Sequence, residues 1–391
     1  MKFLTLISIY LCSLCVNADV KRLYISPHNE NGNGLHGIQH HFPNGVISIE
    51  VNSHEHRELV NNKDIDILEY ASPWELSRHV KSCQPWPSCK NDPPPPPSSR
   101  IYFPNDQTPW GIEEVYNDPL IASTSGGAGV TVAVLDTGAN IEHLDLVGRV
   151  TQCKDFTKRK VPNSCSDSNG HGTHVAGTIA ADGGTDGLGI YGVAPESSLF
   201  IYRVCSRYCW SDDVSAAIIH ATDQGANIIS MSLGGPSLAS IERDAIDYAV
   251  ANGVLVIAAA GNSGPTINTI GYPAAYFKVM AIAALDSSIV VTSWSSRGIN
   301  DGDFIIDERE VEIAMPGSMV ESSLNDGGYY TISGTSMSTP HASGFAAKFW
   351  QGDSGTTRQW IQDRAKLYDI ILGLHADLGD DPASGFGFPT I

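Results

Sequence analysis

Short apolar runs alternate with amphipathic stretches along most of the chain after residue 130. The runs are rich in β-branched and small apolar residues, as buried strands are, and lie at 130–135, 198–204, 227–233, 254–260 and 279–285. Stretches with helical spacing lie at 172–181, 213–224, 241–252 and 336–350. Unbroken apolar strands that alternate with helices predict a central, mainly parallel sheet with helices on both faces, a three-layer α/β domain.

The N-terminal part of the chain has a different pattern. A basic start at 1–2 precedes an apolar run at 3–16, and small residues at 16–18 offer a cleavage point. This pattern predicts a secretory signal peptide over residues 1–18 and therefore a secreted, extracellular protein. Strict alternation at 46–51 predicts a strand. No later segment reaches the roughly 20 apolar residues that a membrane helix needs, so we expect no transmembrane anchor.

A region rich in cysteine and proline, residues 76–104, separates the N-terminal part from the α/β part. Five consecutive prolines at 93–97 favour a stiff, extended left-handed helix without internal hydrogen bonds. We interpret the region as a spacer, and a docking segment for a proline-binding domain is the alternative. A processing site could lie anywhere between residues 71 and 104.

The charge balance excludes some partners. The formal net charge is −19, from 24 basic and 43 acidic residues. Such a surface repels phosphate backbones and anionic lipids, so we expect neither a nucleic acid nor a membrane partner. Solubility and the binding of cations remain as two explanations of the charge.

Six of the eight cysteines follow the predicted signal peptide, in pairs at 83 and 89, 153 and 165, and 205 and 209. In an exported protein, an even number of cysteines at short separations predicts local disulfides. Zinc is the alternative, but these spacings differ from zinc knuckles and bring no paired histidines.

Three short segments carry a reactive side chain beside small residues. They are Val-Leu-Asp136-Thr-Gly, Asn-Gly-His171-Gly-Thr-His-Val-Ala-Gly and Ser-Gly-Thr-Ser336-Met-Ser-Thr-Pro-His. A serine hydroxyl needs a histidine to accept its proton, and the histidine needs a carboxylate to fix its tautomer. The segments therefore predict nucleophilic attack on carbonyl groups by Ser336.

Two of the segments also have a simpler explanation. Asp136 follows a predicted strand and could cap a helix. His171 and His174 are three residues apart and could form a zinc pair, but they lack the glutamate and the spacing of zinc helices. Ser336 begins a predicted helix, where free N–H groups favour negative charge, so its own N–H is suited to hold an oxyanion.

These three segments, in the order Asp, His, Ser, resemble those of the subtilases, the subtilisin-like serine proteases. The resemblance runs from about residue 105 to the Phe-Gly-Phe-Pro ending at 386–389. It implies a subtilisin-like catalytic domain over 105–391 and a secreted, monomeric serine endopeptidase that cleaves proteins and peptides. It also implies a precursor, in which residues 19–75 form a propeptide that inhibits the enzyme until self-processing removes it.

The resemblance extends to the substrate site. The segment 256–264 matches the family's oxyanion segment, which assigns the second oxyanion donor to Asn262. Other matched positions imply a wide primary pocket, without a charge at its base, for a large apolar or aromatic residue. An outer edge at 208–210 would pair with extended substrate. The implied substrate-binding residues are Ser232, Leu233, Gly234, Ala260, Gly271 and Trp210.

The resemblance further implies a structural Ca²⁺ ion. Oxygen ligands around a flexible loop suit this cation, and solvated loop acids are the alternative. The implied ligands are side-chain oxygens of Asp106, Asp145 and Asp186 and the backbone carbonyls of Gly184, Leu188 and Ile190.

Two other classes of function, a non-catalytic binding protein and an esterase or lipase, fit the sequence less well. A catalytically silent subtilase fold that only binds would be expected to lack a member of the triad, and none is missing. Esterases and lipases carry Gly-x-Ser-x-Gly with Ser before Asp and His, the opposite of the order found here. We therefore expect a peptidase.

Overall fold

The computed structural model describes residues 20–27, 35, 37–62, 64–71, 73–76, 103–185 and 187–391. The chain divides into two compact units, Met1–Ala71 and Ser72–Ile391. The predicted signal peptide, the cysteines at 83 and 89 and the proline run lie outside the described residues. Within the described part, no helix combines the length and the apolar character that crossing a membrane requires.

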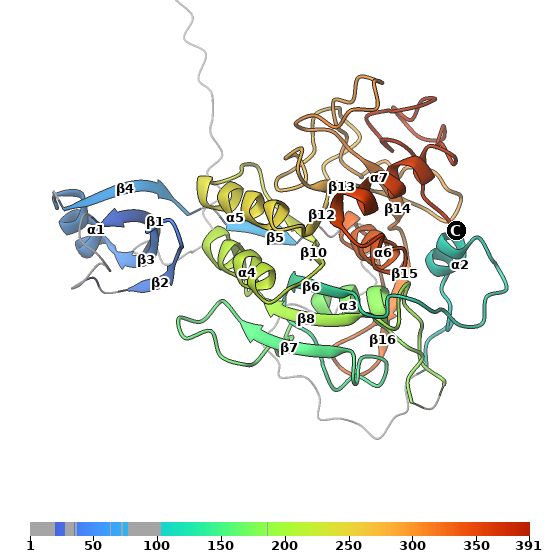
Figure 1. The fold of residues 1–391 in the computed structure, drawn as a ribbon, viewed down its shortest axis with the longest axis horizontal. Coiled ribbons are helices and arrows are strands. Elements are labelled where there is room, and N and C mark those ends of the chain that lie inside the picture. The colour runs from blue at the N-terminus through green and yellow to red at the C-terminus, as the bar shows by residue number, and fades with distance from the viewer. Residues whose placement is uncertain are drawn as a thin grey trace, which may run out of the picture. The chain divides into compact units, whose positions relative to one another are not determined.

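The first unit is a four-stranded antiparallel sheet with one helix (Figure 1). The strand order is β2-β3-β1-β4, and the alternation predicted at 46–51 is confirmed as β3, whose Ile47, Ile49 and Val51 are buried. Asn52 caps the helix by accepting hydrogen bonds from two of its first N–H groups. The elements are β1 Val20–Pro27, β2 Ile38–His41, β3 Ile47–Asn52, α1 Ser53–Val60 and β4 Ile65–Tyr70.

The second unit is built on a seven-stranded sheet in which every pair of neighbours is parallel. Its order is β14-β13-β12-β10-β6-β8-β7, which confirms the predicted α/β class. The strands are β6 Thr131–Asp136, β7 Val150–Asp155, β8 Ser198–Arg203, β10 Ile228–Met231, β12 Leu255–Ala259, β13 Met280–Leu285 and β14 Ile313–Pro316. The five inner strands were predicted. The two edge strands, β7 and β14, were not predicted, and β7 lacks an apolar run because it is only partly buried.

Helices pack on this sheet in two groups. Helices α4 and α5 contact each other, and α3 contacts α6 (Figure 1). Helix α6 packs against β10, β12, β13 and β14. Most of its side chains are small, and residues 335–347 are all buried. The helices are α2 Trp110–Tyr116, α3 His171–Ala180, α4 Ser211–Asp223, α5 Ser240–Ala251, α6 Thr335–Lys348 and α7 Ser354–Ala365.

Two small antiparallel sheets complete the second unit. One has the order β11-β5-β9, from β5 Pro73–Leu76, β9 Cys209–Trp210 and β11 Leu233–Gly234. The other pairs β15 Val320–Ser323 with β16 Tyr329–Ile332. Disulfides join Cys153 to Cys165 and Cys205 to Cys209, so both predicted pairs within the described residues are confirmed.

Candidate active site

Asp136 and His171 form a buried pair at the carboxyl end of the parallel sheet. Asp136 is the last residue of β6, and His171 is the first residue of α3. The Nδ1 atom of His171 lies 2.8 and 3.0 Å from the two carboxylate oxygens of Asp136. A Cβ at Gly172 would lie 2.1 Å from the carbonyl oxygen of Gly138, so only glycine lets α3 begin this close to β6.

Ser336 lies in the first turn of α6 and is tied to the end of β10. Its hydroxyl donates to the carbonyl of Ser232 at 3.0 Å, and the Ser232 hydroxyl donates to the Ser336 carbonyl at 2.8 Å. The Nε2 atom of His171 is buried and has no hydrogen-bond partner among the described residues. The structure therefore joins Asp136 to His171, while the Ser336 hydroxyl is turned toward Ser232.

The side chain of Asn262 is fixed next to Ser336. Its Oδ1 atom accepts hydrogen bonds from the backbone N–H and the hydroxyl of Thr335, at 3.0 and 3.1 Å. The N–H of Gly261 donates to the same hydroxyl at 3.1 Å. Because the amide oxygen is occupied, the Nδ2 group of Asn262 is left as a donor beside the N-terminus of α6.

His174 follows His171 on the same helix but has a different environment. It is fully buried, and its Nε2–H donates to the carbonyls of Val320 and Tyr330 at 3.0 and 3.1 Å. Burial, with a smaller effect of His171, lowers the pKa of His174 to about 3. A neutral, packed histidine fits these contacts, and the zinc alternative gains no support from them.

Strand β5 lies in the groove where extended substrate was expected to bind. Leu76 pairs with Leu233 and Glu75 with Gly234 on one side, and Pro73 pairs with Trp210 on the other. This strand was not predicted from the sequence, and the expected boundary between residues 75 and 76 falls inside it.

Trp74 is the largest fully buried side chain of this contact. Its side chain is fully buried, and its indole Nε1–H donates to the carbonyl of Ser237 at 3.2 Å. A Cβ at Gly235 would lie 2.5 Å from the indole Cδ1 atom, so the glycine makes room for the ring. The Cys205–Cys209 disulfide includes a residue of β9, the neighbouring edge strand.

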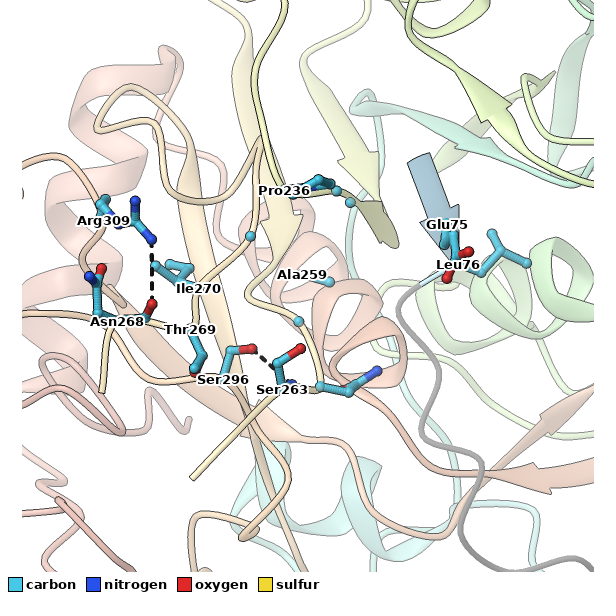
Figure 2. Close-up of a pocket in the computed structure, with 15 residues that line it drawn as sticks. Glu75, Leu76, Pro236, Ala259, Ser263, Asn268, Thr269, Ile270, Ser296 and Arg309 are labelled. Carbon is cyan, nitrogen blue, oxygen red and sulfur yellow. Dashed lines mark hydrogen bonds between the residues drawn. The ribbon is translucent and has the colours of Figure 1, made fainter. Parts of the chain in front are cut away.

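A cavity of about 490 Å³ opens beside β5 (Figure 2). We call it the Gly271 pocket, and its lining includes Gly234, Ala259, Asn262, Ile270 and Gly271. Two of the predicted pocket residues, Gly234 and Gly271, line it.

The other predicted substrate residues lie around the Gly271 pocket rather than in its lining. Ala260 accepts the Gly271 N–H, Leu233 and Trp210 pair with β5, and Ser232 contacts Ser336. The pocket also contains a cation, Arg309, which no motif in the sequence predicted.

The predicted calcium site is assembled in part. Asp145 is fully buried, its Oδ2 accepts the Ile190 N–H at 3.3 Å, and its Oδ1 has no partner among the described residues. A Cβ at Gly189 would lie 1.8 Å from Oδ1, so this oxygen faces the loop at 183–190. Burial raises the pKa of Asp145. An unpaired buried carboxylate oxygen against a glycine-rich loop fits a hard cation.

The contacts of the other predicted calcium ligands give less support to a metal site. Asp106 is exposed, and its Oδ1 accepts the N–H of Thr108 at 3.0 Å. Leu188, whose carbonyl was a predicted ligand, is 48% exposed as a residue. Gln107, which the sequence analysis did not select, donates to the carbonyls of Gly187 and Gly189 at 2.8 and 2.9 Å. Asp186 lies outside the described residues.

Comparison with known proteins identifies the family. The model of the subtilase family matches residues 127–376. The chain is 48% identical over 307 residues to a subtilisin of Bacillus sp. (strain TA39), covering 73% of each chain. It is 41% identical over 244 residues to subtilisin DY of Bacillus licheniformis, covering 61% of this chain and 83% of that one. The solved structure of sphericase matches with a TM-score of 0.72 and 50% identity, over 74% of this chain and 99% of that one. The chain therefore belongs to the subtilase family of serine endopeptidases, which act on protein substrates.

Proposed function

We propose that Asp136, His171 and Ser336 are the catalytic triad of a secreted, self-processing endopeptidase of broad specificity. The main support for this proposal is the position of β5 relative to Ser336. Its Leu76 lies opposite Leu233, the neighbour of Ser232, whose carbonyl accepts the Ser336 hydroxyl. A peptide that replaces β5 in the same register would bring its next residue opposite Ser232, and hence its next carbonyl to Ser336.

The reaction follows from the contacts of the three side chains. Asp136 holds the Nδ1–H of His171, which leaves Nε2 as the base. The Ser336 hydroxyl turns from Ser232 toward this Nε2, gives up its proton and attacks the peptide carbonyl. His171 then protonates the leaving amine, and water hydrolyses the acyl-enzyme by the same path.

The oxyanion of the tetrahedral intermediate needs donors that are already in place. The backbone N–H of Ser336, at the start of α6, supplies one, and the Nδ2 group of Asn262 supplies the other. The two hydrogen bonds from Thr335 hold the Asn262 amide, so that it does not reorganise during the reaction.

The Gly271 pocket receives the acyl residue, the substrate residue whose carbonyl is attacked. Glycine at 234 and 271 and alanine at 259 leave room for a large side chain, and Ile270 adds apolar surface. We therefore propose a preference for large apolar or aromatic acyl residues.

The chain's own N-terminal segment acts as an inhibitor before processing. Strand β5 fills the substrate groove with hydrogen bonds on both edges, and Trp74 buries its whole side chain there. Substrate cannot enter while β5 is paired. Cleavage within residues 71–104 and loss of this strand would release the enzyme.

A structural Ca²⁺ at Asp145 would complete the fold near the N-terminus of the catalytic domain. The buried Oδ1 of Asp145 would be one ligand, and carbonyls of the loop at 183–190 would supply others. The ion would neutralise a carboxylate whose burial is otherwise unfavourable.

The proposal is tested with the precursor and its Ser336→Ala variant. N-terminal sequencing would follow self-cleavage, casein breakdown would follow activity, and a fluorophosphonate probe would label the nucleophile. We expect processing, casein breakdown and labelling in the parent protein only. Equal casein breakdown by both proteins would refute the mechanism.

A further inference from the structure

Arg309 brings a positive charge into the Gly271 pocket. It belongs to the acidic stretch after Asn300, yet its side chain lines the same cavity as Gly271 and Asn268. In Figure 2 it lies at the far end of the pocket from Glu75 and Leu76, beside Asn268 and Ile270. A substrate side chain that enters beside β5 would therefore point toward the guanidinium.

The backbone holds Arg309 in this place. Its N–H donates to the carbonyl of Ala275 at 2.6 Å, and its φ of 72° lies in the left-handed region. Non-glycine residues seldom adopt this conformation, so the surrounding contacts impose it. The backbone position of Arg309 is thus set by the fold of the stretch, and its side chain extends from there into the pocket.

The guanidinium has hydrogen-bonding capacity left over. Its Nη2 donates to the carbonyl of Asn268 over a long 3.4 Å, and its Nε is buried without a partner among the described residues. A guanidinium carries five N–H donors, so the Asn268 contact leaves several for a ligand.

The carboxylates next to Arg309 in sequence have other hydrogen-bond partners. The Glu308 carboxylate accepts the hydroxyl of Tyr272 at 2.9 Å, and the Glu310 carboxylate accepts the N–H of Asp307 at 2.9 Å. Within the described ranges, Arg309 takes part in no ion pair. The pocket therefore combines small and polar lining residues, with some apolar surface from Ala259 and Ile270, with an available cation at its end.

We infer that Arg309 is a specificity-determining residue that makes the pocket accept glutamate as the acyl residue, in addition to large apolar side chains. The inference rests on the proposed function of the pocket. The walls would contact the methylene groups of the glutamate, and Arg309 would bind its carboxylate through charge-assisted hydrogen bonds. Without such a partner, burying a carboxylate is strongly unfavourable, and the pocket would reject it.

The test uses the mature enzyme and three peptide anilides that differ only in the acyl residue, which is Glu, Gln or Phe. Glutamine has the shape of glutamate without its charge, so the ratio of kcat/KM for Glu to that for Gln isolates the electrostatic contribution. We expect Arg309→Met to lower this ratio at least tenfold and Arg309→Lys to lower it less than threefold. The ratio in the parent enzyme should also fall as NaCl is raised.

Arg243→Met is the matched control. Arg243 is an exposed cation on α5 that lies over the Tyr276 ring and does not line the pocket. Its removal changes the net charge by the same amount, so the Glu to Gln ratio should stay as in the parent. Labelling with a fluorophosphonate counts the folded active sites of each variant and separates misfolding from a change of specificity.

Two results would overturn the inference. One is an unchanged Glu to Gln ratio in Arg309→Met, and the other is an equal fall in Arg243→Met. Either result, with cleavage of the Phe substrate intact in the parent, would leave the proposed protease function standing. Failure of the parent to cleave any of the three substrates would instead count against the proposed function.

Discussion

The side-chain oxygen of Asn262 accepts two hydrogen bonds from Thr335, the residue before the proposed nucleophile. In the proposed mechanism, this arrangement aims the Asn262 amide at the place where an oxyanion would form. Asn262→Leu should therefore lower kcat by about 100- to 1,000-fold with little change in KM, a magnitude known from subtilisin itself and carried over here to a member of its family. Steady-state kinetics on a peptide anilide measures both constants.

The supporting role of Thr335 can be tested separately. Thr335→Val removes the hydroxyl that bonds to Asn262 and Gly261 but keeps the backbone N–H, so kcat should fall by about fivefold, the equivalent of one net hydrogen bond. Thr335→Ser keeps the hydroxyl and serves as the control. A valine variant with full kcat would show that the Asn262 amide needs no such support.

Asp136→Asn should lower kcat by about 10⁴-fold, because the amide neither fixes the His171 tautomer nor supports the imidazolium. Asp155→Asn is the control, since Asp155 is also a buried carboxylate at the end of a strand. It should change the free energy of unfolding and leave kcat within threefold. An Asp136→Asn enzyme with a tenth of the parent's kcat would contradict the assigned role.

Two buried histidines should make the fold sensitive to acid. Burial lowers the pKa of His174 to about 3 and that of His341 to about 4, against 6.5 for an exposed histidine. The unfolded chain therefore binds more protons than the native one below pH 6.5, and stability is lost as the pH falls from 6.5 toward 4. At pH 5 each histidine should cost about 2 kcal/mol.

Urea unfolding of the Ser336→Ala protein at pH 7, 6 and 5 measures this loss without self-digestion. The His341→Asn variant should lose less stability between pH 7 and 5 than its parent, by about 2 kcal/mol. Burial raises the pKa of Asp381 to about 6, so protonation of Asp381 increases stability as the pH falls through this value. The effect of His341 must therefore be measured by comparing the variant with its parent. Identical pH dependence in both proteins would exclude His341 as a contributor.

Chelation should destabilise the catalytic domain if Ca²⁺ binds at Asp145. With Ca²⁺ at 100 times its Kd, the ion contributes about 2.7 kcal/mol, so its removal should lower Tm by roughly 5–10 °C. Calorimetry of Ser336→Ala with and without EDTA tests this, and Asp145→Asn should abolish the response. Asp286→Asn, at a distant turn, should keep it. A Tm that is indifferent to EDTA would argue for solvated loop acids.

The burial of Trp74 predicts a preference for tryptophan at one position of the substrate. This position is the fourth residue before the cut, where the acyl residue counts as the first. Peptide anilides with Trp at this position should be cleaved at least tenfold more efficiently than those with Ala, because the indole is fully buried. Gly235→Ala should remove most of this preference, since its Cβ would overlap the ring. Cleavage of the Ala peptide should change little and controls for folding.

The parts of the candidate site that the sequence indicated depend on local neighbours. Asp136, His171, Asn262 and Ser336 each lie in a segment whose small residues permit close approach of the backbone, as Gly172 does at the start of α3. The inner strands were predictable because both of their faces are buried and their apolar runs are unbroken.

The missed features depend on contacts between distant segments. Strand β5 has no pattern of its own, because it is defined by pairing with β9 and β11, which are two residues long each. Arg309 lines the Gly271 pocket only because a whole stretch folds back over Ala275 and Asn268. No periodicity or motif near these residues records such long-range contacts.

If substrate takes the place of β5, as we propose, the pairing of this strand on both of its edges restricts which proteins the enzyme can digest. A segment that takes its place must present at least four residues of extended backbone with both sides free of other hydrogen bonds. Helices and the inner strands of a folded sheet have already used those groups, so they are protected until they unfold. Digestion of a native protein should therefore begin at loose tails and long loops and then follow the rate at which the rest of that protein opens.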